Sequence, residues 1–213
     1  MRATIMRAPG NVVVTEVDRP KIIDPTDAII ELAAACICGS DLWPYRGYDK
    51  AENRAMGHEY VGTVMEVGSD VTEVKPGDFV VGSFCTSDNT CEICNAGYQS
   101  RCVNGEFVSG TQAEFVRIPQ ADGTLVVVPG GRPTDPDVLA SLLATSDVLG
   151  TGWFGAVAAE VAPDKTVAVV GDGAVGLLAI LAARELGAER IIAMSRNPQR
   201  QAVATEFGAT DIV

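Results

Sequence analysis

The first 130 residues carry short apolar runs separated by turn residues. Such runs, rich in β-branched residues and interrupted by polar positions, predict β-strands. We expect strands over residues 3–6, 12–17, 28–35, 60–67, 79–81, 114–118 and 124–127. Pro9-Gly10, Pro76-Gly77-Asp78 and Pro129-Gly130-Gly131 mark turns between them. Since the strands are short and uneven in length, they predict an irregular β-barrel.

The pattern changes to helical spacing at Pro136, which predicts a helical linker over residues 136–159. After it, strands and helices alternate, as in a parallel, doubly wound sheet. We expect strands at 166–170, 190–193 and from 211 onward, and helices at 174–186 and 198–207. The chain is therefore expected to be β followed by α/β, with domains at 1–145 and 146–213. Only the first half of a doubly wound sheet is present.

Charge and composition narrow the range of partners. The chain has 213 residues and a net charge of −12, which disfavours binding to nucleic acid or to an anionic membrane. No apolar segment is long enough to cross a bilayer or to act as a signal peptide, so the cytoplasm is expected. In that compartment the six cysteines are expected to be thiols or metal ligands rather than disulfides.

Three of these cysteines have the spacing of a metal site. Cys91-x-x-Cys94 allows both thiolates to face one ion, and Cys102 returns a third ligand after a longer loop. The fourth ligand is either Asp88, which keeps the two-residue gap, or Cys85, which offers a softer sulfur. Zinc accepts both, and a closed set of four ligands predicts a structural site.

A second candidate metal site involves the only histidine, His58. The preceding Gly57 allows close passage of the backbone, and Glu59 adds an adjacent carboxylate. Cys38 lies in a separate loop, and no local spacing rule joins it to His58. Asp147 stands near the start of the α/β part of the chain and is a candidate for a third ligand. Three protein ligands would leave one coordination position of the metal for a substrate oxygen.

A Gly-x-Gly-x-x-Gly motif follows the strand at 166–170 and opens the helix at 174–186, the context of a dinucleotide fingerprint. The expected cofactor contacts are Gly171, Gly173, Ala174, Val175 and Gly176. Ser195 stands at the end of the next strand, where NAD-binding proteins carry an acidic residue, and Arg196 follows it. A hydroxyl and a guanidinium suit a 2′-phosphate, so NADP is favoured over NAD.

The ordered set of motifs resembles the zinc-containing medium-chain alcohol dehydrogenases. The matching segments are Cys38-Gly-Ser-Asp41, Gly57-His-Glu59, Lys75-Pro-Gly-Asp78, Cys91-x-x-Cys94 with Cys102, Thr151-Gly152 and Gly171 to Gly176. The resemblance implies a GroES-like domain followed by the first half of a Rossmann fold. It further implies hydride transfer between an alcohol, aldehyde or ketone and NAD(P), with zinc as Lewis acid.

The resemblance also assigns roles to individual residues. Cys38, His58 and Asp147 match the catalytic zinc ligands, with Glu59 as a nearby carboxylate that can ligate or orient. Ser40 matches the hydroxyl that passes the substrate proton, and Asp88, Cys91, Cys94 and Cys102 match the structural zinc ligands. Two departures stand out: Asp88 replaces the usual cysteine, and Trp43 occupies the place of the relay histidine. Trp43, Tyr45 and Tyr48 are candidates for the substrate pocket or for packing.

The family's chains continue beyond the part matched here, through a second Rossmann half and a return segment of the catalytic domain, and full-length members form homo-oligomers. Without those parts we expect the first Rossmann strand to be an exposed edge, and the 213-residue chain to be inactive or marginally stable. Two other functions stay open. One is a non-catalytic zinc-binding remnant, and the other is a zinc-free NADPH quinone reductase, which would leave Cys38, His58 and the cysteine trio without a role.

Overall fold

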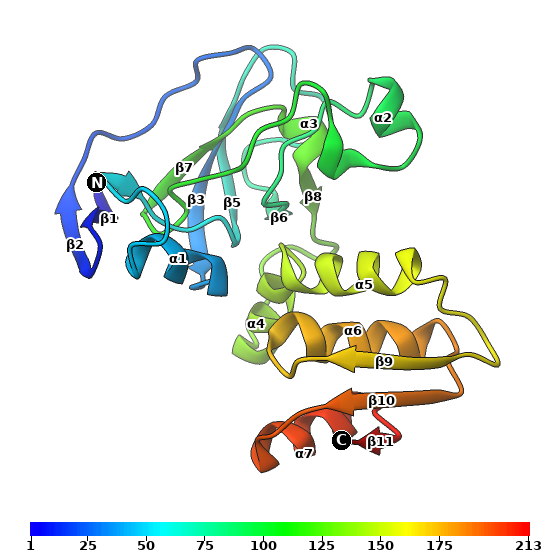
Figure 1. The fold of residues 1–213 in the computed structure, drawn as a ribbon. Coiled ribbons are helices and arrows are strands. Elements are labelled where there is room, and N and C mark those ends of the chain that lie inside the picture. Colours follow the sequence, from blue (N-terminus) through cyan, green and yellow to red (C-terminus); the bar gives the residue numbers. More distant parts are fainter. The chain divides into compact units, whose positions relative to one another are not determined.

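Two antiparallel sheets form the first part of the chain (Figure 1). The computed structural model describes all residues from Met1 to Val213, in two compact units, Met1–Ser146 and Asp147–Val213. In the first unit a three-stranded sheet has the order β2-β1-β4, and a five-stranded sheet has the order β7-β3-β5-β6-β8. The strands are β1 Arg2–Ala8, β2 Asn11–Glu16, β3 Ala28–Ala35, β4 Arg54–Ala55, β5 Tyr60–Val67, β6 Phe79–Gly82, β7 Phe115–Ile118 and β8 Leu125–Val127.

All seven strands predicted for this region are present, and β4, only two residues long, is an addition. The helices of the unit are short: η1 Gly39–Asp41, α1 Leu42–Tyr45, α2 Glu92–Asn95, η2 Gln99–Arg101, α3 Ala121–Thr124 and α4 Pro136–Ala144. The core lies within the five-stranded sheet, where Ile30, Tyr60, Val80 and Ile118 are fully buried. These four side chains come from four neighbouring strands of the sheet, β3, β5, β6 and β7.

The second unit is a three-stranded parallel sheet of order β11-β10-β9 with its helices. Its elements are α5 Val148–Ala158, β9 Thr166–Val170, α6 Ala174–Glu185, β10 Arg190–Met194, α7 Pro198–Phe207 and β11 Asp211–Ile212. The helix α6 packs on β9 and β10 and against α5 and α7. Parallel strands joined by helices confirm the predicted first half of a Rossmann fold.

The predicted helical linker over 136–159 consists of two helices, α4 and α5, with a break at Thr145–Asp147. At the break the Thr145 and Ser146 hydroxyls donate to the carbonyl oxygens of Leu142 and Leu143, each at 2.6 Å. Such bonds satisfy the last carbonyls of α4 and compete with a further turn. Asp147 then takes a non-helical conformation with φ −145° and ψ −69°. No helix in the structure has both the length and the apolar character needed to cross a bilayer.

Candidate functional site

A buried carboxylate, Asp41, lies close to both Cys38 and His58. Cys38 follows β3 and caps the short helix η1, and its backbone N–H donates to Asp41 Oδ2 at 3.0 Å. Asp41 Oδ1 lies 3.9 Å from His58 Nδ1. A carboxylate on one ring nitrogen orients a histidine and leaves the other nitrogen to bind a metal. Sequence reasoning gave Asp41 no role, although it is part of the Cys38-Gly-Ser-Asp41 motif.

His58 and Glu59 enter the site from the start of β5. Gly57, with φ +90°, makes this entry possible, since a Cβ there would come within 2.7 Å of the Thr111 side chain. The Glu59 side chain is almost fully buried, and its Oε1 lies 4.0 Å from His58 Nε2. The His58 ring also meets Phe84 edge-on, with 6.3 Å between the ring centroids.

Cys38, His58, Glu59 and Asp147 form one group of potential metal ligands. Each offers one ligand atom, and these atoms all lie within 4.8 Å of one another. Asp147 directly follows Ser146, whose carbonyl oxygen accepts a hydrogen bond from the backbone of Phe84 at 3.3 Å. A thiolate, an imidazole and two carboxylates are donors that zinc accepts, so the residues present fit a zinc ion.

Ser40 lies on η1, two residues beyond Cys38, and its side chain is exposed. It lines a pocket of about 390 Å³ together with Trp43, Pro44, Tyr48, Asp49 and Arg54. The rings of Trp43 and Tyr48 meet edge-on with centroids 6.4 Å apart. Of the three aromatic candidates for a substrate pocket, Trp43 and Tyr48 line this one. Tyr45 does not.

The second group of potential ligands contains Asp88, Cys91, Cys94 and Cys102, again with their ligand atoms within 4.8 Å of one another. Cys85, the alternative fourth ligand, instead forms an isolated β-bridge with Phe107. The Asp88 carboxylate accepts hydrogen bonds from the backbone N–H groups of Thr90 and Cys91 and from Asn104. These bonds, the one from Cys91 above all, hold the pKa of Asp88 far below its usual range. Asp88 is therefore an anionic oxygen donor beside three sulfurs.

The glycine fingerprint has the local structure that its motif predicts. Gly171 ends β9 with φ +111°, and Gly173 precedes α6, whose first residues are Ala174 and Val175. A Cβ on Gly176 would collide with the carbonyl oxygen of Gly171, so the close contact between helix and turn requires glycine there. The N-terminus of α6 thus presents unpaired N–H groups at the turn, as in anion-binding sites.

Two residues near the end of β10, Asp172 and Arg200, were not among the predicted cofactor contacts. Ser195 is buried, and its hydroxyl donates to Asp172 Oδ2 at 2.7 Å. Asp172 lies inside the fingerprint, and its Oδ1 accepts from Arg200 Nη1 at 3.0 Å. Arg196 is exposed. The sequence shows Asp172 between Gly171 and Gly173, which could have drawn attention to it. Its partners, Ser195 and Arg200, are 23 and 28 residues away, so the sequence does not reveal them.

Comparison with known proteins identifies the family of this chain. The profile of the alcohol dehydrogenase GroES-like domain matches residues 24–130. The chain is 37% identical to zinc-type alcohol dehydrogenase B of Aspergillus flavus, over 98% of this chain and 50% of that protein. It is 35% identical to the medium chain reductase/dehydrogenase ucsI of an Acremonium species, over 98% of this chain and 74% of that protein.

This chain belongs to the zinc-containing medium-chain alcohol dehydrogenase family. Its fold matches that of the alcohol dehydrogenase TADH from Thermus sp. ATN1 with a TM-score of 0.89 at 34% identity, over 100% of this chain and 63% of that structure. The chain thus spans about half to three quarters of the length of these dehydrogenases.

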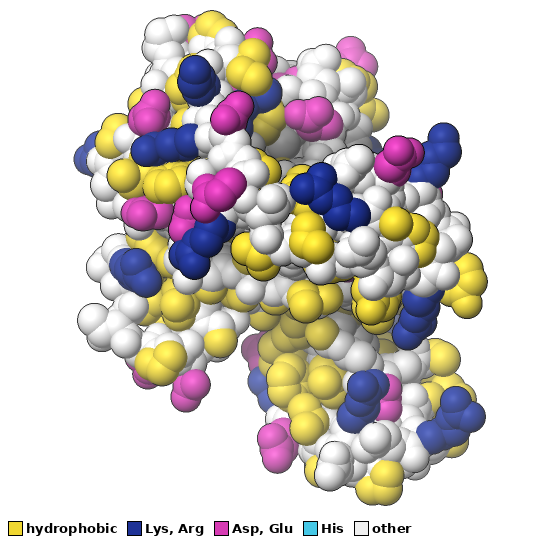
Figure 2. Space-filling model, turned by 90° about the vertical axis from the view of Figure 1, so that its left-hand side faces the viewer, with side chains coloured by type: hydrophobic (Ala, Val, Ile, Leu, Met, Phe, Trp, Pro, Cys, Tyr) yellow, Lys and Arg dark blue, Asp and Glu magenta, His cyan; other side chains and the backbone are white.

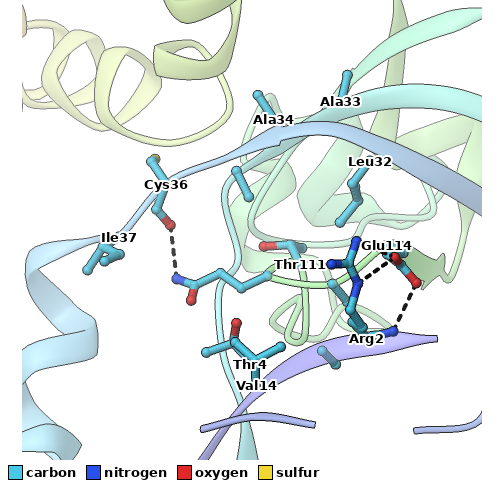
Figure 3. Close-up of a pocket in the computed structure, with 14 residues that line it drawn as sticks. Arg2, Thr4, Val14, Leu32, Ala33, Ala34, Cys36, Ile37, Thr111 and Glu114 are labelled. Atoms are coloured by element: carbon cyan, nitrogen blue, oxygen red, sulfur yellow. Dashed lines mark hydrogen bonds and ion pairs between the residues drawn. The ribbon is translucent and has the colours of Figure 1, made fainter. Parts of the chain in front are cut away.

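A pocket of about 480 Å³ contains none of the candidate ligands (Figure 3). It lies beside β1 and the second half of β3 and is lined mostly by short side chains, among them Ala33 and Ala34. Its charged groups satisfy one another, because Arg2 Nη2 lies 2.9 Å from Glu114 Oε1. The bond from Gln112 Nε2 to the Cys36 carbonyl, at 3.3 Å, fixes the strand that leads to Cys38. We assign the pocket no chemistry.

Charged side chains are scattered on the face that Figure 2 shows. There the Lys and Arg side chains alternate with acidic ones and with apolar patches, without a continuous basic stripe. This distribution accords with the net charge of −12 and offers no surface suited to a nucleic-acid backbone on that face.

Proposed function

We propose that the protein containing this chain transfers hydride between an alcohol, or the corresponding aldehyde or ketone, and a nicotinamide cofactor. The observation that carries this proposal is the grouping of Cys38, His58, Glu59 and Asp147 ligand atoms within 4.8 Å. When bound, zinc supplies a Lewis acid that polarises the substrate oxygen, and the nicotinamide ring supplies the hydride acceptor or donor. A second zinc ion held by Asp88, Cys91, Cys94 and Cys102 would be structural.

The chain's own residues account for positioning and for proton movement. Asp41 fixes the Cys38 backbone and faces His58, so it holds two of the proposed ligands in place. The exposed Ser40 hydroxyl can accept the proton that an alcohol loses and pass it on. Since Trp43 stands where the family resemblance implies a relay histidine, Ser40 must pass this proton to cofactor ribose, water or another group.

We further propose NADP as the preferred cofactor. Two observations support it: neither Ser195 nor Arg196, the residues that follow β10, is acidic, and the cationic Arg196 is exposed. A guanidinium binds a phosphate group bidentately, whereas an acidic residue at this place would accept the ribose hydroxyls of NAD.

Metal analysis combined with turnover tests the proposal. We expect two zinc ions per chain, and one each in Cys38→Ser and Cys94→Ser. In Ser40→Ala we expect both zinc ions to remain, while hydride transfer from secondary alcohols falls by roughly 10²–10⁴-fold, the usual contribution of a positioned proton-transfer group.

The results separate the candidate functions. Two zinc ions without cofactor binding or turnover would favour the non-catalytic remnant. Freshly purified protein without zinc would contradict the proposal and favour a zinc-free reductase.

A further inference from the structure

The Asp172 carboxylate lies over the end of β10, within the second unit. Ser195, which directly follows this strand, is only 6% exposed, whereas the Asp172 side chain is 21% exposed. The bond from Ser195 Oγ to Asp172 Oδ2 is 2.7 Å long. At this position the polar group that faces solvent is thus the carboxylate of Asp172 rather than the hydroxyl of Ser195.

This arrangement commits the only proton of the Ser195 hydroxyl. A serine hydroxyl has one O–H to donate, and here it is donated to Asp172. Ser195 can then offer only lone pairs to a ligand, which a phosphate group cannot use. A ribose hydroxyl can donate its one proton to Ser195 or to a carboxylate.

Asp172 stands in the fingerprint turn, next to the place where a dinucleotide fold holds the ribose. The hydrogen bonds from Ser195 and Arg200 keep the pKa of Asp172 below its usual range, so the group is an anion at neutral pH. It therefore supplies from the turn the negative charge that the end of β10 lacks.

Arg200 supplies the opposing charge. Its Nη1 lies 3.0 Å from Asp172 Oδ1, while its side chain remains 57% exposed. A guanidinium has five N–H donors, so this one contact leaves others available to a phosphate. A 2′-phosphate at this site would meet Arg196 and Arg200 together with the repelling carboxylate of Asp172.

We propose that Asp172 sets the balance between the two nicotinamide cofactors. Its carboxylate accepts the 2′-hydroxyl of NAD and opposes the 2′-phosphate of NADP, so the preference for NADP is small and both cofactors bind. This inference rests on the proposed function, because it presumes that the fingerprint holds a nicotinamide dinucleotide.

The test compares the affinities of the protein containing this chain for NAD and NADP by isothermal titration calorimetry, at one fixed salt concentration. The variant is Asp172→Asn, which keeps the side-chain shape and the capacity to accept a bond from Ser195. Removal of one charge near a phosphate is expected to shift the ratio of the two Kd values about tenfold toward NADP.

The matched control is Asp211→Asn. Asp211 also pairs with an arginine, Arg190, at 2.7 Å in the same unit, so its removal makes the same change in net charge away from the fingerprint. We expect the ratio of Kd values to stay within twofold of the original. Circular dichroism of each variant checks that the fold is retained.

An unchanged ratio in Asp172→Asn would overturn the inference. A shift toward NAD would also overturn it, since Asp172 would then position Ser195 and Arg200 for the phosphate. If the unaltered protein binds neither cofactor, the proposed function fails and this inference fails with it. If both bind and the ratio does not respond to Asp172, only the inference fails.

Discussion

Tyr60, two residues after His58, has a fully buried side chain whose hydroxyl has no hydrogen-bond partner in the structure. Burial raises the pKa of this phenol well above its usual value near 10, so the group is neutral at any physiological pH. A buried polar group without a partner costs roughly 1–3 kcal/mol of stability. The unpaired hydroxyl thus destabilises the first unit at the start of β5, the strand that directly follows His58 and Glu59.

We expect Tyr60→Phe to raise the free energy of unfolding by about 1–2 kcal/mol, because it removes the unpaired hydroxyl and keeps the ring. Urea unfolding followed by fluorescence measures the change. Tyr48→Phe is the control, since Tyr48 is 75% exposed, and it should leave stability unchanged. A less stable Tyr60→Phe protein would mean that the hydroxyl is satisfied, for example by an internal water.

At the scale of single residues, sequence spacing identified candidate site residues well, but it did not identify the residues that they contact. The rule of two intervening residues named Cys91 and Cys94 and left Asp88 and Cys85 as alternatives, and only the folded loop brings Asp88 to the cysteines. The partners of Asp172 could not be predicted, since they come from β10 and α7. Contacts between distant segments depend on tertiary structure, which local patterns do not encode.

At the scale of elements, hydrophobic periodicity predicted the strands and the two Rossmann helices, because burial of one face enforces that periodicity. It did not predict α1, α2 or α3, which have four residues each and are too short to show a helical period. It predicted a helical linker but not the break between α4 and α5. The hydroxyls of Thr145 and Ser146 end α4 through local bonds that do not interrupt an apolar pattern.

The loop that contains α2 and η2 has almost no core of its own. Cys94 is the only buried residue between Asp88 and Phe107. Helices of three or four residues are not stable alone in water. The fold of this loop is therefore expected to depend on the metal held by Asp88 and the three cysteines.

We expect removal of metal by a chelator to expose the backbone of residues 88–107 to hydrogen exchange, while β3 and β5 stay protected. Because a chelator also strips the site at Cys38, Cys94→Ser is the more specific change and should expose the same loop without chelator. The control is Cys85→Ser, which alters a buried cysteine outside the ligand group. Equal protection of the loop with and without metal would mean that its own contacts stabilise it.

At the scale of the whole molecule, the feature of greatest consequence is the edge of the parallel sheet. The order β11-β10-β9 places β9 at that edge, as the sequence led us to expect for the first Rossmann strand. Val170, the last residue of β9, is 80% exposed. An unpaired apolar edge is a template for pairing with another strand, whereas the net charge of −12 opposes contact between two chains.

The balance between these effects predicts self-association of the 213-residue chain that strengthens with salt, because salt screens the repulsion. Ala168→Lys places a charge on an exposed position of β9 and should weaken association several-fold, as charged residues on natural edge strands do. Sedimentation velocity over a range of protein and salt concentrations measures the strength of this association.

The control is Ala158→Lys, on an exposed position of α5. It makes the same change in net charge away from the edge and should have little effect. Equal effects of the two lysines would show that net charge rather than the β9 edge controls association, and a chain that stays monomeric throughout would contradict the prediction.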